Sequence, residues 1–512
     1  TSHWLPSLDD MNDKIEFDLS YQVPQDYEVA ANGKLVNKEK KGKEQLWHFD
    51  MQHPMSSYLV AVAVGKFEAK EITSTSGIPI KLYYEAQDEE KVEWTYKHSK
   101  KIFDFFEEEI GVAYPWQNYK QIPVRDFLYA GMENTTATIF SDMFMVDQIG
   151  FIDRNYVNVN AHELAHQWFG DLVTEKSGTH HWLQEGFATY YALLAEREIF
   201  GEDYFYFKLY QNAEKLKELS DSGKGEALRN PKASSLTFYQ KGAWALHILR
   251  EKVGDEAFRT GVKNYLNTYA FQNVETEDFI AEIEKTSGMD LTQFEEDWLA
   301  QSAFKSSQAL ASLRKSEFME EYLSLIALRT ISMEEKYESL NKALDFPVND
   351  YLGQEVVAQL AQENAGDVIQ LYRKAFDTNN VLVRQAISTY LQKVPQSLQK
   401  KYEGLLNDRS YLTLEQALFN LWQNFPENRN QYLAELQNVE GFSNKNVRLL
   451  WLTLSLVTPE FQPENNSKFY QQLSGYTSAK YAYEIRQNAF GFLYQIESFT
   501  EQNYLDLIQG SV

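Results

Sequence analysis

The amino-acid sequence predicts a multidomain α+β protein with three successive regions. Residues 1–72 alternate apolar and polar side chains with the period of β-strands, whereas residues 73–300 combine a few strands with long helices. Residues 317–512 show helical patterns throughout. A chain of 512 residues exceeds the size of one hydrophobic core, so several domains are expected.

The first region, residues 1–72, is predicted to be the remainder of an N-terminal β domain. Residues 15–21 alternate with period two, and Asn32-Gly33 is a hairpin turn signal. Further strands are expected at 46–50, 58–65 and 67–72. So few strands make a poor independent domain, and we expect the first part of the β domain to precede Thr1.

The second region, residues 73–300, is predicted to be the catalytic domain. A strand at 80–85 precedes a helix at 89–110, which ends at Gly111. Strands are then expected at 120–124 and 136–140, and helices dominate from residue 158.

The third region is predicted to be a helical repeat domain. Residues 301–316 are small and polar and are expected to form a linker. From 317 to 512, turn signals recur every 30 to 40 residues or so, a spacing typical of paired antiparallel helices. We therefore expect an α-solenoid of HEAT or armadillo type.

Composition excludes several classes of function. The net charge is −25, from 74 acidic and 49 basic residues, which argues against binding to nucleic acids or anionic membranes. The absence of cysteine excludes disulfides and thiolate chemistry. No apolar run reaches the ~18 residues of a transmembrane helix. Neither the compartment nor the oligomeric state follows from these numbers.

The chemistry-bearing stretch is H-E-L-A-H, residues 162–166, followed after eighteen residues by Glu185. On a helix, His162 and His166 lie on one face, one turn apart. Two imidazoles, a carboxylate and one open position form the ligand set of a catalytic zinc ion. Glu163 lies beside the ligands and is predicted to be the general base. The alternative is a surface helix with two solvated histidines, but the surrounding segment is strongly apolar.

Three motifs together resemble the M1 family of zinc aminopeptidases, which are gluzincins. H-E-L-A-H with E-G-F-A at 185–188 resembles the family's zinc motif. Residues 130–134, A-G-M-E-N, are similar to the family's G-[AG]-M-E-N signature, with Ala130 as a departure. Residues 239–242, Y-Q-K-G, are similar to the family's Y-x-K-G. The resemblance in sequence covers about residues 1–300. The remaining residues resemble the family in architecture only.

The resemblance implies roles that the residues alone do not. It implies a thermolysin-like catalytic domain, one zinc ion per chain, and recognition of a substrate's free α-ammonium group by Glu133. It also implies that Gly131 and Met132 bind the peptide backbone and that Tyr239 stabilises the oxyanion. Without the motifs, Glu133 would be one acid among 74 and Tyr239 a core tyrosine. A second amine-binding residue is expected just before Thr1.

Outside these motifs, the sequence suggests a few supporting residues. Asp171 is a candidate hydrogen-bond partner for a ligand histidine. His180 and His181 are expected in an exposed loop, not at the metal. Gln184 replaces the Asn that often precedes the ligand Glu185 in the family, and we expect its effect to be local.

The predicted function is hydrolysis of the N-terminal peptide bond of peptides that carry a free N-terminus. Two alternatives stay open: an epoxide hydrolase on the same zinc site, and a catalytically degenerate scaffold whose helical repeats bind a partner. Intact ligands and an intact Tyr239 argue against the scaffold, and no residue specifically supports the epoxide hydrolase.

Overall fold

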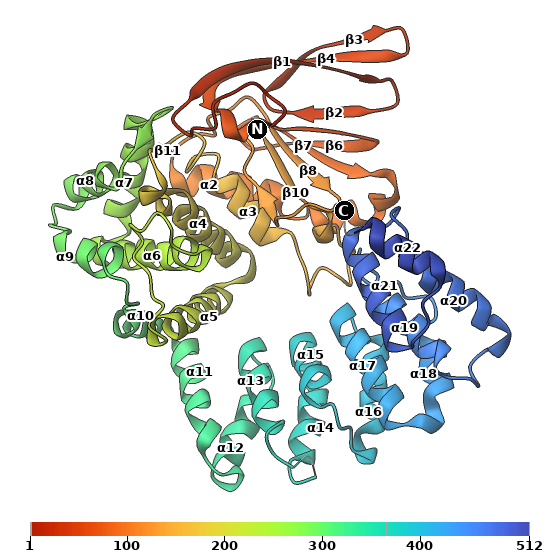
Figure 1. The fold of residues 1–512 in the computed structure, drawn as a ribbon. Helices are drawn as coiled ribbons and strands as arrows, with labels where there is room; N and C mark the ends of the chain where they lie inside the picture. The colour runs from red at the N-terminus through yellow and green to blue at the C-terminus, as the bar shows by residue number, and fades with distance from the viewer. Residues whose placement is uncertain (1–2, 365, 511–512) are drawn as a thin grey trace. The chain divides into compact units, whose positions relative to one another are not determined.

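A computed structural model describes residues 3–364 and 366–510 and has a mixed α/β fold (Figure 1). The chain divides into two compact units. The first contains residues 1–142 and 156–319, and the second contains residues 143–155 and 320–512. The chain therefore passes from one unit to the other at three points.

The strands of the first unit form four small sheets. The largest has the order β6-β7-β8-β10-β9, with β9 at one edge, and a three-stranded sheet has the order β1-β4-β3. Two pairs, β2-β5 and β11-β12, complete the set among the described residues. The strand bounds are β1 Lys14–Pro24, β2 Glu28–Ala31, β3 Lys34–Lys41, β4 Glu44–Ser56, β5 Val62–Gly65, β6 Phe67–Thr73, β7 Pro79–Glu85, β8 Tyr119–Val124, β9 Gly131–Met132, β10 Ala137–Ser141, β11 Thr174–Glu175 and β12 Asn273–Val274.

The helices of the first unit differ from the expected ones in two places. The helix expected at 89–110 is broken at Tyr96, whose ring packs on Phe140 and Tyr156. The segment 301–316, expected as a linker, contains a helix that packs on α5 and α6. The helix bounds are α1 Val92–Thr95, α2 Ser99–Ile110, α3 Val157–Ala165, α4 Trp182–Phe200, α5 Glu202–Asp221, α6 Gly242–Val253, α7 Asp255–Thr268, α8 Thr276–Ser287, α9 Thr292–Phe294 and α10 Ser306–Leu313.

Helix α4 forms the centre of the first unit and packs on both α3 and α6. Its residues from Trp182 to Glu196 are all buried, as expected for a helix that is apolar on every side. At the crossing with α6, two glycines face each other. A Cβ added at Gly242 would lie 2.7 Å from the Cα of Gly186, closer than any side chain tolerates. The glycines of the E-G-F-A and Y-Q-K-G motifs therefore allow one close helix contact.

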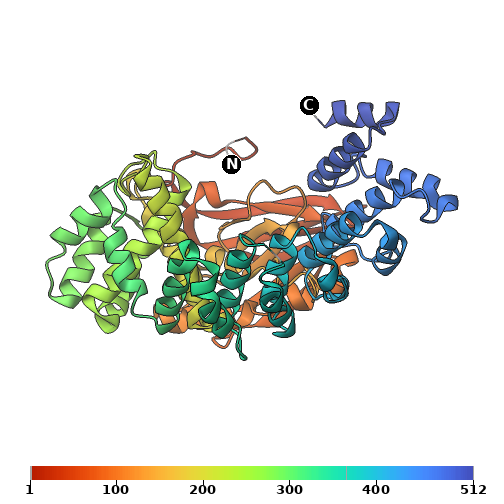
Figure 2. The same cartoon turned by 90° about the horizontal axis from the view of Figure 1, so that it is seen from below.

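The second unit is helical, and consecutive helices lie next to one another in both views (Figure 1, Figure 2). Alternate helices pack in the series α13, α15, α17, α19 and α21 over one hydrophobic core. The interpretation as a HEAT- or armadillo-type solenoid stays a prediction. The helix bounds are α11 Glu317–Ala327, α12 Met333–Ala343, α13 Asp350–Leu360, α14 Ile369–Asp377, α15 Val381–Tyr390, α16 Gln399–Glu403, α17 Tyr411–Asn424, α18 Arg429–Glu435, α19 Asn446–Leu456, α20 Asn466–Gly475, α21 Tyr483–Gln495 and α22 Glu501–Gln509.

The segment 143–155 lies between β10 and α3 in the chain but belongs to the second unit. Asp147 accepts a hydrogen bond of 2.5 Å from the Tyr411 hydroxyl. Asp153 accepts hydrogen bonds from Ser410 at 2.7 Å and from Gln385 at 2.8 Å. These contacts attach the stretch before helix α3 to α15 and α17.

Across the described residues, none of the helices combines the length and the apolar character that a bilayer-spanning helix requires.

We predict that Gly242→Ala destabilises the first unit. The added methyl group has to separate α6 from α4, and such overpacking costs about 1–3 kcal/mol. Gly491→Ala is the matched control, because Gly491 lies inside helix α21 with nothing within 4 Å of an added Cβ. In that open position alanine is favoured over glycine by up to ~1 kcal/mol. Urea unfolding of both variants checks this, and equal midpoints would contradict a tight glycine contact.

Candidate metal centre

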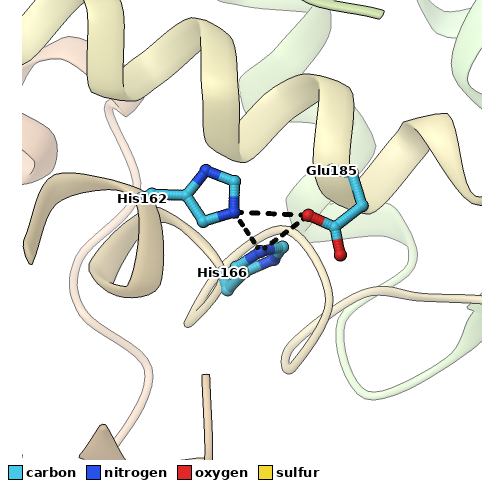
Figure 3. Close-up of side chains that lie close together, drawn as sticks. All are labelled: His162, His166 and Glu185. Atoms are coloured by element: carbon cyan, nitrogen blue, oxygen red, sulfur yellow. Dashed lines mark hydrogen bonds and ion pairs between the residues drawn. The ribbon is translucent and has the colours of Figure 1, made fainter. Parts of the chain in front are cut away.

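Three side chains from α3 and α4 converge on one point (Figure 3). His162 lies on α3, His166 follows directly after its last turn, and Glu185 lies in the first turn of α4. Glu185 Oε2 is 3.2 Å from His162 Nε2 and 3.4 Å from His166 Nε2, and the two Nε2 atoms are 3.1 Å apart. The helical i, i+4 spacing predicted from the sequence is thus present.

These three atoms fit a tetrahedral zinc ion. Bonds of about 2.0–2.1 Å imply ligand atoms roughly 3.3 Å apart, and the three observed separations are close to this value. Glu185 Oε2 is buried and, apart from the two imidazoles that face it, has no hydrogen-bond partner among the described residues. A buried carboxylate oxygen without a donor is costly, and a metal ion would satisfy it.

The orientation of His166 is fixed by the backbone, not by Asp171. His166 Nδ1 donates a hydrogen bond of 2.9 Å to the Phe169 carbonyl, which directs Nε2 toward Glu185. The sequence-based interpretation of Asp171 as the histidine's partner is therefore wrong. Asp171 is fully buried nearby, and burial raises the pKa of its carboxyl well above the usual range.

Glu163 lies beside this cluster and packs against the backbone of Gly131. A Cβ at Gly131 would overlap with the Glu163 carboxylate, so the glycine makes room for it. Burial raises the pKa of Glu163 well above its ordinary value, while the nearby His166 opposes this rise. A buried carboxylate with a raised pKa beside a candidate metal site is a candidate general base.

Glu133 lies close to the same cluster. Its carboxylate, that of Glu163 and a nitrogen of His166 lie within 4.8 Å of one another. The Tyr58 hydroxyl faces Glu133 Oε1 at 3.5 Å, and Gln167 Nε2 donates to the Glu133 carbonyl at 3.2 Å. Glu133 follows β9, which contains Gly131 and Met132 and forms one edge of the five-stranded sheet. The expected second amine-binding residue before Thr1 falls outside the described residues.

Tyr239 lies in a π-helical turn, Thr237–Lys241, just before α6. Its ring stacks on His162 with centroids 5.3 Å apart and an interplanar angle of 5°. Burial raises the pKa of the Tyr239 hydroxyl, and so do the charge and hydrogen bond of Glu185. Lys241 points away from the site and donates to the carbonyls of Glu226 at 2.7 Å and Gln301 at 2.6 Å.

The structure adds Glu175, which the sequence analysis did not name, and His181, which it placed away from the site. His181 is half-buried, not in an exposed loop, and its ring lies between the carboxylates of Glu175 and Glu185. The i, i+4 spacing of His181 and Glu185 was an available signal. Glu175 could not be found in this way, because it lies in the two-residue strand β11, whose partner β12 is distant in the sequence.

Comparisons with known proteins agree with this geometry. Residues 94–298 match the model of the Peptidase family M1 domain. The chain is similar to Aminopeptidase M1 from Arabidopsis thaliana, with 28% identity over 61% of this chain and 38% of that protein. It is 30% identical to Probable aminopeptidase 2 from Sulfurisphaera tokodaii, over 59% of this chain and 40% of that one. Leucyl aminopeptidase from Saccharolobus solfataricus is 29% identical over 63% and 42% of the two chains.

These matches span about two fifths of the length of the curated relatives. Among solved structures, a two-domain M1 zinc metallopeptidase variant bound to L-tryptophan has a TM-score of 0.50 and 23% identity, over 57% of this chain and 65% of that one. At this identity the likeness concerns the fold. The three motifs all lie within residues 94–298, the stretch that matches the family model, and these residues are therefore a peptidase family M1 domain.

Proposed function

We propose that this chain is a zinc-dependent aminopeptidase that hydrolyses the N-terminal peptide bond of peptides. The observation that carries the proposal is the convergence of His162, His166 and Glu185 at separations that suit a tetrahedral zinc ion. Glu163 and Tyr239 flank that point, as metal-assisted hydrolysis requires. A non-catalytic scaffold would not need this arrangement.

Each side chain then has one task in the reaction. His162, His166 and Glu185 hold the ion, which when bound polarises the scissile carbonyl and lowers the pKa of water to about 7. Glu163 takes the proton from the attacking water and passes it to the leaving amine. The Tyr239 hydroxyl donates a hydrogen bond to the oxyanion that develops on the carbonyl oxygen.

The substrate's N-terminus is recognised by Glu133. The Glu133 carboxylate pairs with the free α-ammonium group, which would place the first peptide bond beside the three side chains that would hold the ion. The free edge of β9 supports backbone contacts from Gly131 and Met132, because an extended peptide can add a strand to a sheet edge.

The central test is Glu163→Gln. Glutamine has nearly the same shape but accepts no proton, so zinc content should stay at the wild-type level while kcat falls about 10²–10⁴-fold. Glu196→Gln is the matched control: Glu196 is also buried, on α4, but it pairs with Tyr204 and Asn158. The measurements are the rate of aminoacyl amide hydrolysis and the zinc content of the wild type and of both variants. Wild-type activity that survives removal of the metal by a chelator would refute a metallopeptidase.

Cleavage should require a free N-terminus. An N-acetylated peptide has no charge to pair with Glu133, so we expect it to be inert while its free counterpart is cleaved. Glu133→Ala should lose most of the activity on free peptides. Product analysis by mass spectrometry checks both points, and cleavage inside a blocked peptide would show that Glu133 does not anchor an amine.

Tyr239→Phe should lower kcat by about 10²–10³-fold with KM nearly unchanged, because the hydroxyl is needed where charge develops. Phenylalanine keeps the stacking on His162 and should leave zinc content unchanged. Tyr190→Phe serves as the control, since Tyr190 is buried on α4 beside His247 and Phe258. Steady-state kinetics measure the effect. A higher KM at constant kcat would make Tyr239 a substrate-binding residue instead.

A further inference from the structure

The carboxylate of Glu185 presents its two oxygens to different histidines. Oε2 faces His162 and His166 at 3.2 and 3.4 Å, whereas Oε1 lies 3.6 Å from His181 Nε2. We propose that His181, held in place by Glu175, is a positioning residue that leaves Glu185 a single oxygen for the metal. The inference rests on the proposed zinc site and adds two residues to it.

The ring of His181 is held firmly at its far side. Nδ1 lies 3.0 Å from Glu175 Oε1 and 3.2 Å from Oε2, so the carboxylate contacts it with both oxygens. The ring edge also packs on Phe238, with centroids 4.9 Å apart and planes at 84°. An imidazole with protons on both nitrogens can face two carboxylates at once.

Glu175 is itself fixed by the surrounding backbone. Its side chain is only 2% exposed. Its amide donates to Gln184 Oε1 at 3.0 Å, and its carbonyl accepts from Asn273 Nδ2 at 3.0 Å. Gln184 directly precedes Glu185 in the chain, and His181 faces the Glu185 carboxylate. Glu175 contacts both Gln184 and His181, and so orients both neighbours of Glu185.

The contact between His181 and Glu185 affects how many carboxylate oxygens can bind the metal. A carboxylate can bind an ion through one oxygen or both, and the second oxygen would occupy a position that a catalytic zinc ion keeps open for water. His181 competes with the ion for Oε1 and so favours binding through Oε2 alone. Partners of this kind behind a metal ligand are typically worth about 10–100-fold in metal affinity.

The role of the His181 side chain is separable from that of its backbone. The His181 carbonyl accepts hydrogen bonds from the amides of Gln184 and Glu185, both at 3.1 Å, and so begins helix α4. A substitution of the side chain leaves these bonds intact. His180→Phe is a matched control in the same turn, because His180 contacts Thr276 at 3.0 Å.

The test is zinc affinity, measured at fixed pH by competition with a chromogenic chelator, together with the visible spectrum of the Co²⁺-loaded protein. His181→Phe keeps an aromatic ring beside Phe238 and should weaken zinc binding about 10–100-fold and alter the Co²⁺ spectrum. His180→Phe should stay within about threefold of wild type. A His181→Phe affinity within threefold of wild type, or an equal loss in His180→Phe, overturns the inference.

Glu175 supplies a second pair of variants, which decides the matter if His181→Phe does not fold. Glu175→Gln keeps an acceptor for the Nδ1 proton, whereas Glu175→Ala removes it, so zinc affinity should fall in the order wild type, Gln, Ala. Equal affinities overturn the inference while the proposed function stands. A wild-type protein that binds no zinc refutes the proposed function as well, so the two failures are distinguishable.

Discussion

The dominant physical constraint on this site is the burial of negative charge. Five carboxylates lie within the protein around His162 and His166, and each is at most 8% exposed: Glu133, Glu163, Asp171, Glu175 and Glu185. Ionised carboxylates are expensive to bury unless cations or donors compensate them. Lys14 compensates part of this charge, and burial lowers its pKa to about 8 although Asp171 opposes the shift. A divalent cation between the histidines and Glu185 would offset two more of these charges.

The close contact of α4 with α6 determines how near Tyr239 lies to the buried carboxylate of Glu185. Gly186 follows the ligand Glu185 directly, and Gly242 ends the motif that begins with Tyr239. Because the two glycines touch, the hydroxyl of Tyr239 reaches Glu185 and its ring reaches His162. Backbone proximity, not a long side chain, therefore brings the tyrosine to the candidate metal site.

Features that depend on residues close together in the sequence could be predicted, whereas features that depend on distant residues could not. The ligand set depends on helical spacing within α3 and on the first turn of α4, and such local spacing is visible in a sequence. The break at Tyr96 and the two-residue strand β11 depend on partners more than forty residues away, and no local pattern indicates them. Asp171 was misassigned because a backbone carbonyl, that of Phe169, took the role that a side chain was expected to fill.

The three crossings between the units have a consequence for how the chain matures. The segment 143–155 leads directly into α3, yet its partners Gln385, Ser410 and Tyr411 are more than two hundred residues downstream. During synthesis, which proceeds from the N-terminus, these three contacts form only after α17 has emerged from the ribosome. Loop closure over such a separation slows folding, so the segment before α3 completes these contacts late.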